Sequence, residues 1–290
     1  QKALSNLKRA GLLPDELLAI VDHNQTFCDA VEPQIGAAFA NRFSKKDLPN
    51  FAKIAERLNS FMPKKLGIHN IKPLDILCTN EFEEALSQAT ESGKTNPLTN
   101  WRNRWLEKNH AGDFVFKDRK RSKKLREVAK IYQKYSDQLE KDQLFDFDDM
   151  ICLVAHTLET IAELRFNLQE QYLYIMVDEF QDTNGAQLRL LNALTNNPIH
   201  EGRPNILAVG DDDQAIYSFQ GAELSNILDF KNSYRNVAVI TLTDNYRSAA
   251  PILQHSRDVI TLGAERLENT LENVNKQLNA KNAVQKSTTE

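Results

Sequence analysis

The spacing of apolar residues changes part-way along the chain. Over residues 1–140 apolar side chains recur at helical intervals, for example at Leu125, Val128, Ile131 and Leu139. Apolar residues that return every three or four positions are typical of one face of an α-helix. The first 140 residues are therefore predicted to be largely helical, with two of the helices over 48–61 and 125–139.

Three short uncharged runs in the second half of the chain predict β-strands. They cover residues 172–177, 205–209 and 237–242, and residues 186–194 between the first two have helical spacing. Their ends are about one strand-helix-strand unit apart. Runs of this kind are typical of strands buried on both faces of a parallel sheet. The pattern predicts an α/β domain with a parallel sheet.

Polar side chains follow each predicted strand. Asp178 and Glu179 come directly after the first, residues 210–214 after the second, and residues 243–248 after the third. Ligands bind beyond the carboxyl ends of parallel strands, and carboxylates there suit a phosphate-bound Mg²⁺. A lone acidic pair is more often a solvated turn. Three polar loops in series favour a nucleoside triphosphate site instead.

The loops carry longer motifs that resemble those of the UvrD/Rep/PcrA-like superfamily 1 helicases. The matching segments are Val177-Asp-Glu-Phe-Gln-Asp-Thr-Asn184 for motif II, Val209-Gly-Asp-Asp-Asp-Gln-Ala-Ile-Tyr-Ser-Phe-Gln-Gly-Ala222 for motif III, Leu242-Thr-Asp-Asn-Tyr-Arg-Ser248 for motif IV, and an upstream Phe145-Asp-Phe-Asp-Asp-Met150. The resemblance covers about residues 140–265. It implies the RecA-like core of a P-loop NTPase, an α/β domain with a parallel sheet, carrying a largely α-helical inserted subdomain.

The resemblance also divides the chain. Residues 1–140 correspond mostly to the helical insertion, called 1B in the family, and 141–235 to the later part of the first ATPase domain, 1A. Residues 236–265 form the junction with the second ATPase domain and carry motif IV. Residues 266–290 are expected to be a polar helical or disordered tail.

Roles at a nucleotide site follow from the resemblance residue by residue. Asp178 is expected to hold Mg²⁺, Glu179 to activate the attacking water, and Gln214 to sense the γ-phosphate. Arg247 is expected to reach that phosphate from the second ATPase domain. Three further residues are candidates for contact with the nucleotide, namely Tyr246, Gln181 and Asp211, and Tyr246 matches the residue that stacks on adenine.

Two aromatic residues of motif III are candidates for DNA contact. In the family, aromatics at the positions of Tyr217 and Phe219 stack on single-stranded bases, an interaction that needs no sequence readout. The family usually has tryptophan where this chain has Phe219. Packing in a core is the alternative for both side chains.

The activity implied is that of an ATP-dependent DNA helicase. ATP and Mg²⁺ would be its cofactors, single-stranded and duplex DNA its partners, and movement would run 3′ to 5′ in DNA repair, replication or recombination. Two alternatives stay open, a non-catalytic nucleic-acid-binding scaffold and the helicase part of a helicase-nuclease.

The P-loop of the family is not found in these residues. Gly93-Lys94-Thr95 spells its end, but Gln88 stands where the first glycine is required, and the preceding residues are charged with helical spacing. A phosphate-binding P-loop needs both glycines after a buried strand. The 290-residue chain by itself is therefore expected to hydrolyse ATP negligibly.

A basic run and two tryptophans allow two interpretations. Seven of the ten residues from Lys117 to Arg126 are basic, and Trp101 and Trp105 precede them. They could contact a DNA backbone and its bases. Alternatively the run is solvated, and the tryptophans, four residues apart, form the apolar stripe of a helix.

Four residues of the upstream motif predict a helix start. Asp146-Phe-Asp-Asp149 precedes the apolar run 150–158, and acids there stabilise the positive end of a helix. We assign them a capping role and no catalytic role.

Composition adds limits without identifying a reaction. The chain has 41% apolar and 26% charged residues and a net charge of −4, which argues against a protein that coats nucleic acid. Its three cysteines are far apart, which favours a reducing compartment and no zinc site. No apolar run is long enough to cross a bilayer, and no signal peptide is recognisable. A cytoplasmic location is expected.

Overall fold

The computed structural model describes residues 2–61, 73–215, 225–263, 266–270 and 274–281. The chain divides into two compact units. Unit 1 comprises Gln1–Lys8 and Leu12–Met150, and unit 2 comprises Arg9–Gly11 and Ile151–Glu290.

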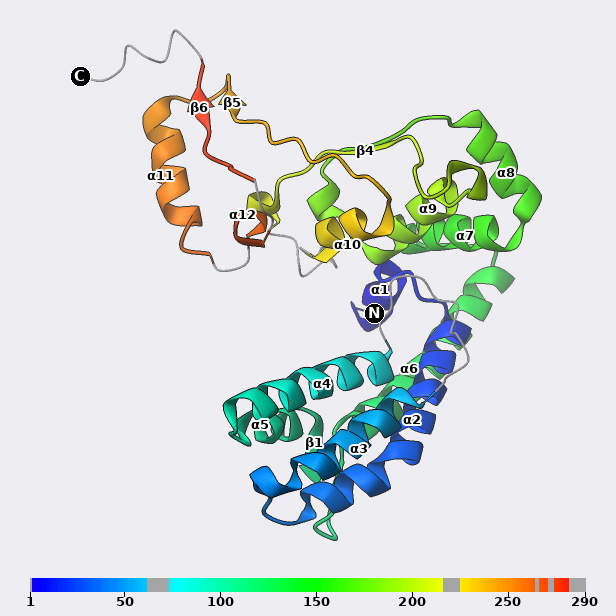
Figure 1. Ribbon diagram of the computed structural model, residues 1–290. Helices are drawn as coiled ribbons and strands as arrows, with labels where there is room; N and C mark the ends of the chain where they lie inside the picture. The colour runs from blue at the N-terminus through cyan, green and yellow to red at the C-terminus, as the bar shows by residue number, and fades with distance from the viewer. Residues whose placement is uncertain (1, 62–72, 216–224, 264–265, 271–273, 282–290) are drawn as a thin grey trace. The chain divides into compact units, whose positions relative to one another are not determined.

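Unit 1 is built from helices and one small hairpin (Figure 1). Its described elements are α1 (Lys2–Arg9), α2 (Pro14–Ala40), α3 (Leu48–Asn59), α4 (Leu74–Ser92), α5 (Asn96–Trp105), the antiparallel strands β1 (Leu106–Lys108) and β2 (Phe114–Phe116), α6 (Asp118–Lys141), and the first residues of α7 (Phe147–Thr160). The predictions of helices over 48–61 and 125–139 are confirmed by α3 and α6.

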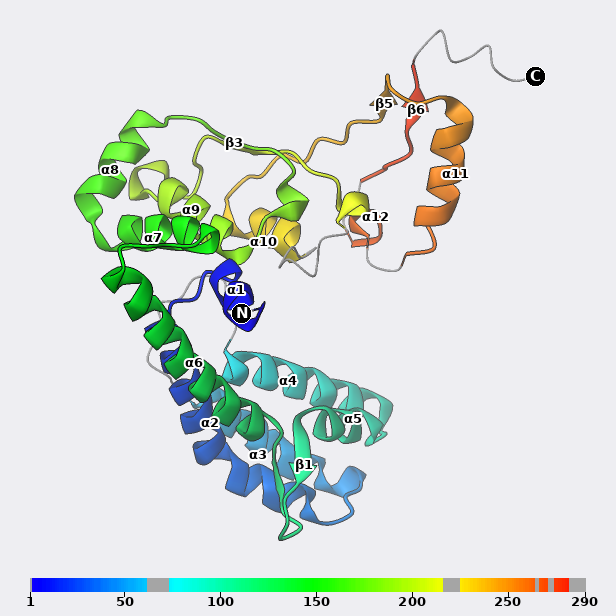
Figure 2. The same ribbon diagram turned by 180° about the vertical axis from the view of Figure 1, so that it is seen from behind.

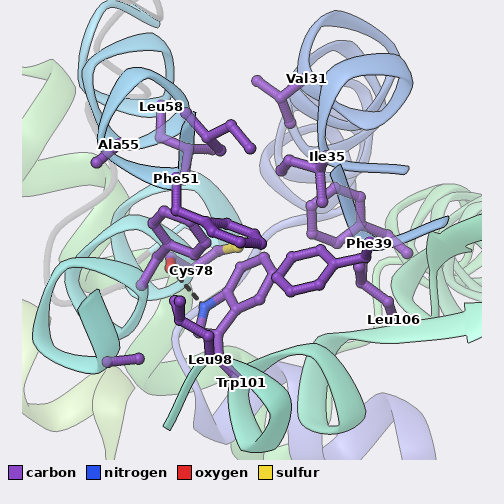
Figure 3. Close-up of a cluster of buried hydrophobic side chains, with 14 of the residues drawn as sticks. Val31, Ile35, Phe39, Phe51, Ala55, Leu58, Cys78, Leu98, Trp101 and Leu106 are labelled. Atoms are coloured by element: carbon purple, nitrogen blue, oxygen red, sulfur yellow. Dashed lines mark hydrogen bonds between the residues drawn. The ribbon is translucent and has the colours of Figure 1, made fainter. Parts of the chain in front are cut away.

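The core of unit 1 lies among α2, α3, α4 and α5 and is rich in aromatic rings (Figure 3). Trp101 is only 4% exposed. Its ring stacks on Phe39 at a centroid distance of 5.9 Å and meets Phe82 edge-on at 4.8 Å. Its indole Nε1 donates to the carbonyl oxygen of Cys78 at 3.1 Å. Trp101 is therefore a core residue, as the helical-stripe interpretation expects, and its ring is not open to a DNA base.

Part of the basic run holds α6 against α2, and the two helices lie side by side in both views (Figure 1, Figure 2). Arg119 pairs with Asp29 at 2.7 Å and also with Glu32, both on α2. Arg126 pairs with Asp22 of the same helix. Surface ion pairs stabilise a fold by less than about 1 kcal/mol each, so these contacts mainly orient α6. DNA contact by the rest of the run stays a prediction.

The acidic motif at the start of α7 is a helix cap, as predicted. The backbone N–H of Asp149 donates to Asp146 Oδ1 at 2.9 Å, and that of Asp146 donates to Asp149 Oδ2 at 3.1 Å. Lys8, only 1% exposed, places its ammonium 2.7 Å from Asp146 and 2.6 Å from Asp149. Burial lowers the pKa of Lys8, but the hydrogen bonds to both carboxylates outweigh it and raise that pKa. The cation therefore ties α1 to this cap.

Replacing Lys8 by methionine is expected to destabilise unit 1 by about 2–3 kcal/mol, because two carboxylates would stay close together without their cation. Loss of one partner of a fully buried pair costs roughly 3–5 kcal/mol, and Asp146 is 35% exposed. Both tryptophans lie in unit 1, so their fluorescence during guanidinium unfolding measures this unit alone.

Lys130→Met is the matched control for this prediction. Lys130 pairs with Glu127 at 2.7 Å, but both side chains are more than half exposed. Removing this cation should change the free energy of unfolding by less than about 1 kcal/mol. Equal losses in the two variants would contradict the role given to Lys8.

Unit 2 combines helices with short parallel strand pairs. Its described elements are the rest of α7, α8 (Ala162–Gln171), β3 (Ile175–Val177), α9 (Gly185–Thr195), β4 (Ile206–Ala208), α10 (Ser225–Ser233), β5 (Asp244–Asn245), α11 (Ala250–Ile260), α12 (Leu267–Thr270) and β6 (Asn279–Ala280). The helix predicted over 186–194 is confirmed by α9. In the predicted tail, α12 and β6 are ordered elements, and residues 282–290 lie outside the described part.

Residues 9–11 belong to unit 2 because they pack on the start of α9. A Cβ on Gly185 would lie 2.6 Å from the carbonyl oxygen of Ala10, so only glycine fits there. Arg189 donates from Nη1 to the carbonyl oxygen of Gly11 at 2.6 Å and from Nε to Glu159 at 2.7 Å. These contacts fix α9 against α7 and so support the sheet edge that α9 follows.

The first two predicted strands are confirmed in part. Of residues 172–177 only β3 is a strand, and it pairs in parallel with β4, which lies within 205–209. Ile175 is opposite Ile206, and Val177 is opposite Ala208. The backbone N–H of Val209 donates to the carbonyl of Val177 at 2.8 Å, which extends the ladder beyond β4. The carboxyl ends of β3 and β4 therefore lie at one edge, so the polar residues that follow them start side by side.

Two details of the strand prediction are wrong. Residues 237–243 form no strand, and Ile240 and Leu242 are 80% and 77% exposed. Instead the next residues form β5, which pairs in parallel with β6. Nor are the first two strands buried on both faces, since Met176 is 76% exposed and Leu207 52% exposed. Among the described residues no helix packs on the face of the β3–β4 pair that carries Met176 and Leu207. A strand face is buried only where another element packs on it.

The remaining sequence predictions concern cysteines and membranes. Cys28, Cys78 and Cys152 all lie in the described ranges, are buried and form no disulfide. Burial raises the pKa of the Cys28 thiol to about 12, which keeps it protonated and unreactive at neutral pH. Within the described ranges, no helix combines the length and the apolar character that crossing a bilayer requires.

Candidate nucleotide site

The chain turns sharply after β3, at the two acidic residues. Glu179 has φ 49° and ψ 45°, a left-handed conformation that is unfavourable for a residue with a side chain. Asp178 Oδ1 accepts from the Glu179 backbone N–H at 3.0 Å. The Phe180 N–H then donates to the carbonyl of Val209 at 2.9 Å. Such strain persists where surrounding contacts enforce it and is common at functional sites.

Gln181 joins this turn to the loop after β4. Its Nε2 donates to Glu179 Oε2 at 2.7 Å, and its Oε1 accepts from the Asp211 backbone N–H at 3.0 Å. The side chain is 2% exposed. The amide nitrogen and the amide oxygen are thus both bonded to protein. The resemblance predicts that Gln181 contacts the nucleotide directly, and this geometry does not favour that prediction.

The loop after β4 is held by Asp211. Its Oδ1 accepts from the Asp213 N–H at 3.2 Å, and its Oδ2 accepts from Gln214 Nε2 at 2.8 Å. A short 3-10 turn over Asp212–Gln214 results. A series of hydrogen bonds therefore links Glu179, Gln181, Asp211 and Gln214, which come from two motifs about 30 residues apart.

Asp178 and Glu179 face a cavity of about 360 Å³. The rest of its lining consists of leucines of α9 together with Val177, Asp182, Thr183 and Gln187. Asp178 and Glu179 are exposed, and Asp178 lines the cavity directly. Carboxylate oxygens are the ligands that Mg²⁺ prefers, so this donor set fits such an ion.

A second cavity, of about 670 Å³, lies beside the other loop. Asp211, Asp213 and Gln214 line it together with residues of α11 and Lys276. Asp178 and Glu179 do not border it. The structure thus brings the candidate residues of motifs II and III to one sheet edge and into one hydrogen-bonded series. Asp178 and Glu179 nevertheless line one cavity, and Asp211 and Gln214 line the other.

Sequence reasoning missed two cations that bind the acidic loop. Lys276 Nζ lies 2.6 Å from Asp212 and 2.9 Å from Asp213, and it also pairs with Asp211. Arg266 donates to both oxygens of Asp213 at 2.8 Å. Burial raises the pKa of Asp213, but the hydrogen bonds from Arg266 and Lys276 outweigh it and lower the pKa to about 2. More than 50 residues separate these partners in sequence, so no local pattern could have revealed them.

The structure does not bring the motif IV residues to either cavity. Tyr246 is 69% exposed and Arg247 is also exposed. Neither residue lines the 360 Å³ cavity or the 670 Å³ cavity. Asn245 Oδ1 accepts from the N–H groups of Arg247 and Ser248 at 2.9 and 2.8 Å, which shapes this loop. The roles of Tyr246 and Arg247 stay predictions. Tyr217 and Phe219, the candidate DNA contacts, lie outside the described residues.

Comparison with known proteins decides the family. The profile of the UvrD/REP helicase N-terminal domain matches residues 10–235, most of the chain. The chain belongs to the UvrD/REP helicase family. Membership implies the α/β fold of a P-loop NTPase, of which the described residues show the parallel pair β3–β4.

Individual members of the UvrD/REP family support this assignment. The chain is 38% identical over 144 residues to the ATP-dependent DNA helicase PcrA of Leuconostoc citreum and 40% identical over 139 residues to that of Bacillus subtilis strain 168. It is 34% identical over 151 residues to the ATP-dependent DNA helicase Rep of Buchnera aphidicola. The matches cover 50%, 48% and 52% of this chain but 19%, 18% and 23% of those proteins. The chain therefore spans about a fifth of the length of these UvrD/REP relatives.

Proposed function

We propose that this chain is part of an ATP-dependent DNA helicase that couples ATP hydrolysis to movement along single-stranded DNA and to unwinding of duplex DNA. The similarity to proteins named PcrA and Rep supports this class of enzyme. The 3′-to-5′ direction, a role in DNA repair, replication or recombination, and a cytoplasmic location remain expectations from the family resemblance.

One structural observation carries the proposal. The parallel pairing of β3 with β4 brings Asp178 and Glu179 to the same sheet edge as Gln214, and Gln181 connects the two loops. An acidic pair beside an amide, at the carboxyl ends of parallel strands, suits the grip and hydrolysis of a nucleoside triphosphate.

We assign the following chemistry to these residues. Asp178 would hold a Mg²⁺ ion, which when bound to ATP neutralises charge that develops on the phosphates. Glu179 orients the attacking water and accepts its proton, and Gln214 contacts the γ-phosphate. Arg247 would reach the same phosphate from the second ATPase domain and Tyr246 would stack on adenine, while Tyr217 and Phe219 would stack on bases.

Phosphate release by the full-length protein that contains this chain tests the proposal. With ATP and Mg²⁺, addition of single-stranded DNA should raise turnover into the range of about 1–1000 per second typical of enzymes. The 290-residue chain alone, in which no P-loop sequence is found, should stay below about one per second under the same conditions.

Two outcomes of this assay would contradict the proposal. A full-length protein that binds single-stranded DNA but hydrolyses no ATP would be a scaffold. An isolated chain that turns over ATP with DNA as fast as the full-length protein would show that the phosphates are held without the family's P-loop.

A further inference from the structure

We infer that Gln181 is a positioning residue that sets the orientation of Glu179 and links it to the loop bearing Gln214. This inference rests on the proposed function, since it concerns the same reaction. Its basis is the pair of hydrogen bonds at the two ends of one buried amide, 2.7 Å to Glu179 Oε2 and 3.0 Å from the Asp211 N–H.

The amide of glutamine is suited to this position. The side chain here must donate to a carboxylate and accept from a backbone N–H. A side-chain amide is uncharged and provides both, since its NH₂ group donates and its carbonyl oxygen accepts. The neighbouring backbone is shaped to admit it, since a Cβ on Gly210 would lie 2.6 Å from Gln181 Oε1. A glycine at this point therefore lets the β4 loop approach the amide closely.

Burial assigns Gln181 an indirect role. At 2% exposure its amide is bonded to protein at both ends. Glu179, in contrast, is exposed and borders the cavity beside Asp178. The bond from Gln181 fixes one carboxylate oxygen of Glu179, which restricts rotation of a side chain that would otherwise be free in solvent. A base held in one orientation acts faster than one that samples many.

The second bond extends the link to the γ-phosphate sensor. Gln181 holds the backbone of Asp211, and Asp211 Oδ2 in turn accepts from Gln214 Nε2 at 2.8 Å. A displacement of Gln214 when the γ-phosphate leaves would move Asp211 and, through Gln181, the carboxylate of Glu179. The four residues therefore act as one unit, and loss of any link is expected to affect the others non-additively.

Two substitutions in the full-length helicase separate the functions of the amide. Gln181→Met keeps the length of the side chain and removes both hydrogen bonds. Gln181→Glu keeps an acceptor for the Asp211 N–H but removes the donor and places a second carboxylate against Glu179. Each is expected to lower kcat for DNA-stimulated ATP hydrolysis by roughly ten- to hundredfold, as for other residues that orient catalytic groups. KM for ATP should change by less than about threefold, because the amide does not touch the nucleotide.

Gln169→Met is the matched control. Gln169 is a second buried glutamine, 5% exposed, whose Nε2 donates to the carbonyl of Ala193 at 2.8 Å. It bonds α9 and neither of the two loops. Its substitution tests the cost of burying methionine in place of an amide, and it should leave kcat unchanged.

A double variant tests the link to the sensor. Gln181→Met combined with Gln214→Ala should lose about as much kcat as the worse single variant, instead of the product of the two losses. Multiplied losses would show that the two residues act separately and would overturn the coupling.

The outcomes distinguish this inference from the proposed function. If Glu179→Gln abolishes hydrolysis but either Gln181 variant keeps kcat within about twofold of the original, or Gln169→Met loses as much, the positioning role is overturned and the helicase proposal stands. If Glu179→Gln hydrolyses ATP normally, the proposed function itself fails. If Gln181→Met does not fold, the kcat of Gln181→Glu still tests the positioning role, because this variant preserves the bond to the Asp211 N–H.

Discussion

Replacing Glu179 by glutamine in the full-length protein is expected to lower kcat for ATP hydrolysis by about a thousandfold while ATP still binds. The substitution keeps the size of the side chain and its left-handed backbone, but the neutral amide cannot accept a proton from water. General base catalysis contributes roughly 10²- to 10⁴-fold to a rate. Phosphate release at saturating ATP and single-stranded DNA measures the loss, and binding of a fluorescent ATP analogue measures retained affinity.

Glu201→Gln is the matched control for this substitution. Glu201 has almost the same backbone conformation, φ 49° and ψ 33°, and its carboxylate is exposed and 3.5 Å from Arg203. It follows a 3-10 turn away from the β3 loop and lines neither cavity. Its loss should leave kcat unchanged. A similar loss of kcat in both variants would mean that general charge removal, and not the position of Glu179, causes the effect.

Replacing Trp101 by alanine is expected to destabilise unit 1 by about 3–5 kcal/mol, the usual cost of truncating a large buried aromatic residue. The indole is 4% exposed, contacts Phe39 and Phe82, and donates to the Cys78 carbonyl. Guanidinium unfolding followed by the fluorescence of Trp105, which stays in the same unit, measures the change.

Trp101→Phe separates packing from the hydrogen bond. Phenylalanine keeps an aromatic ring in the core and loses the indole donor, so a smaller loss of about 1–2 kcal/mol is expected. A tryptophan that served to stack on DNA would behave differently. Both variants would then unfold like the original protein, and DNA affinity would fall by roughly 1–3 kcal/mol per lost stacking contact.

Local pattern predicted helices such as α3, α6 and α9 because each helix satisfies its own backbone hydrogen bonds. The capping acids of α7 and the apolar stripe of α6 are readable from a few neighbouring residues. The strands were less predictable. Residues 237–242 have the composition of a strand, but a strand forms only where another strand supplies a partner, and here β5 and β6 pair instead.

The residues of the candidate site could be proposed from the sequence, but the contacts among them could not. The acidic pair at Asp178 and the position of Gln214 after the next strand could be recognised from motif and order. The bond from Gln181 to the backbone of Asp211 and the ion pairs of Lys276 with the acidic loop join residues that are 30 and more than 60 positions apart. Such contacts depend on how the whole domain folds, which no short pattern encodes.

We propose that the loops after β3 and β4 face one bound triphosphate. The most direct measurement is a crystal structure of the full-length protein with Mg²⁺ and a non-hydrolysable ATP analogue. We expect Asp178 to bind the ion directly at about 2.1 Å or through one water. Glu179 and Gln214 should both lie within hydrogen-bonding reach, about 2.6–3.2 Å, of the attacking water or the γ-phosphate. An analogue bound with its γ-phosphate away from either loop would contradict the account.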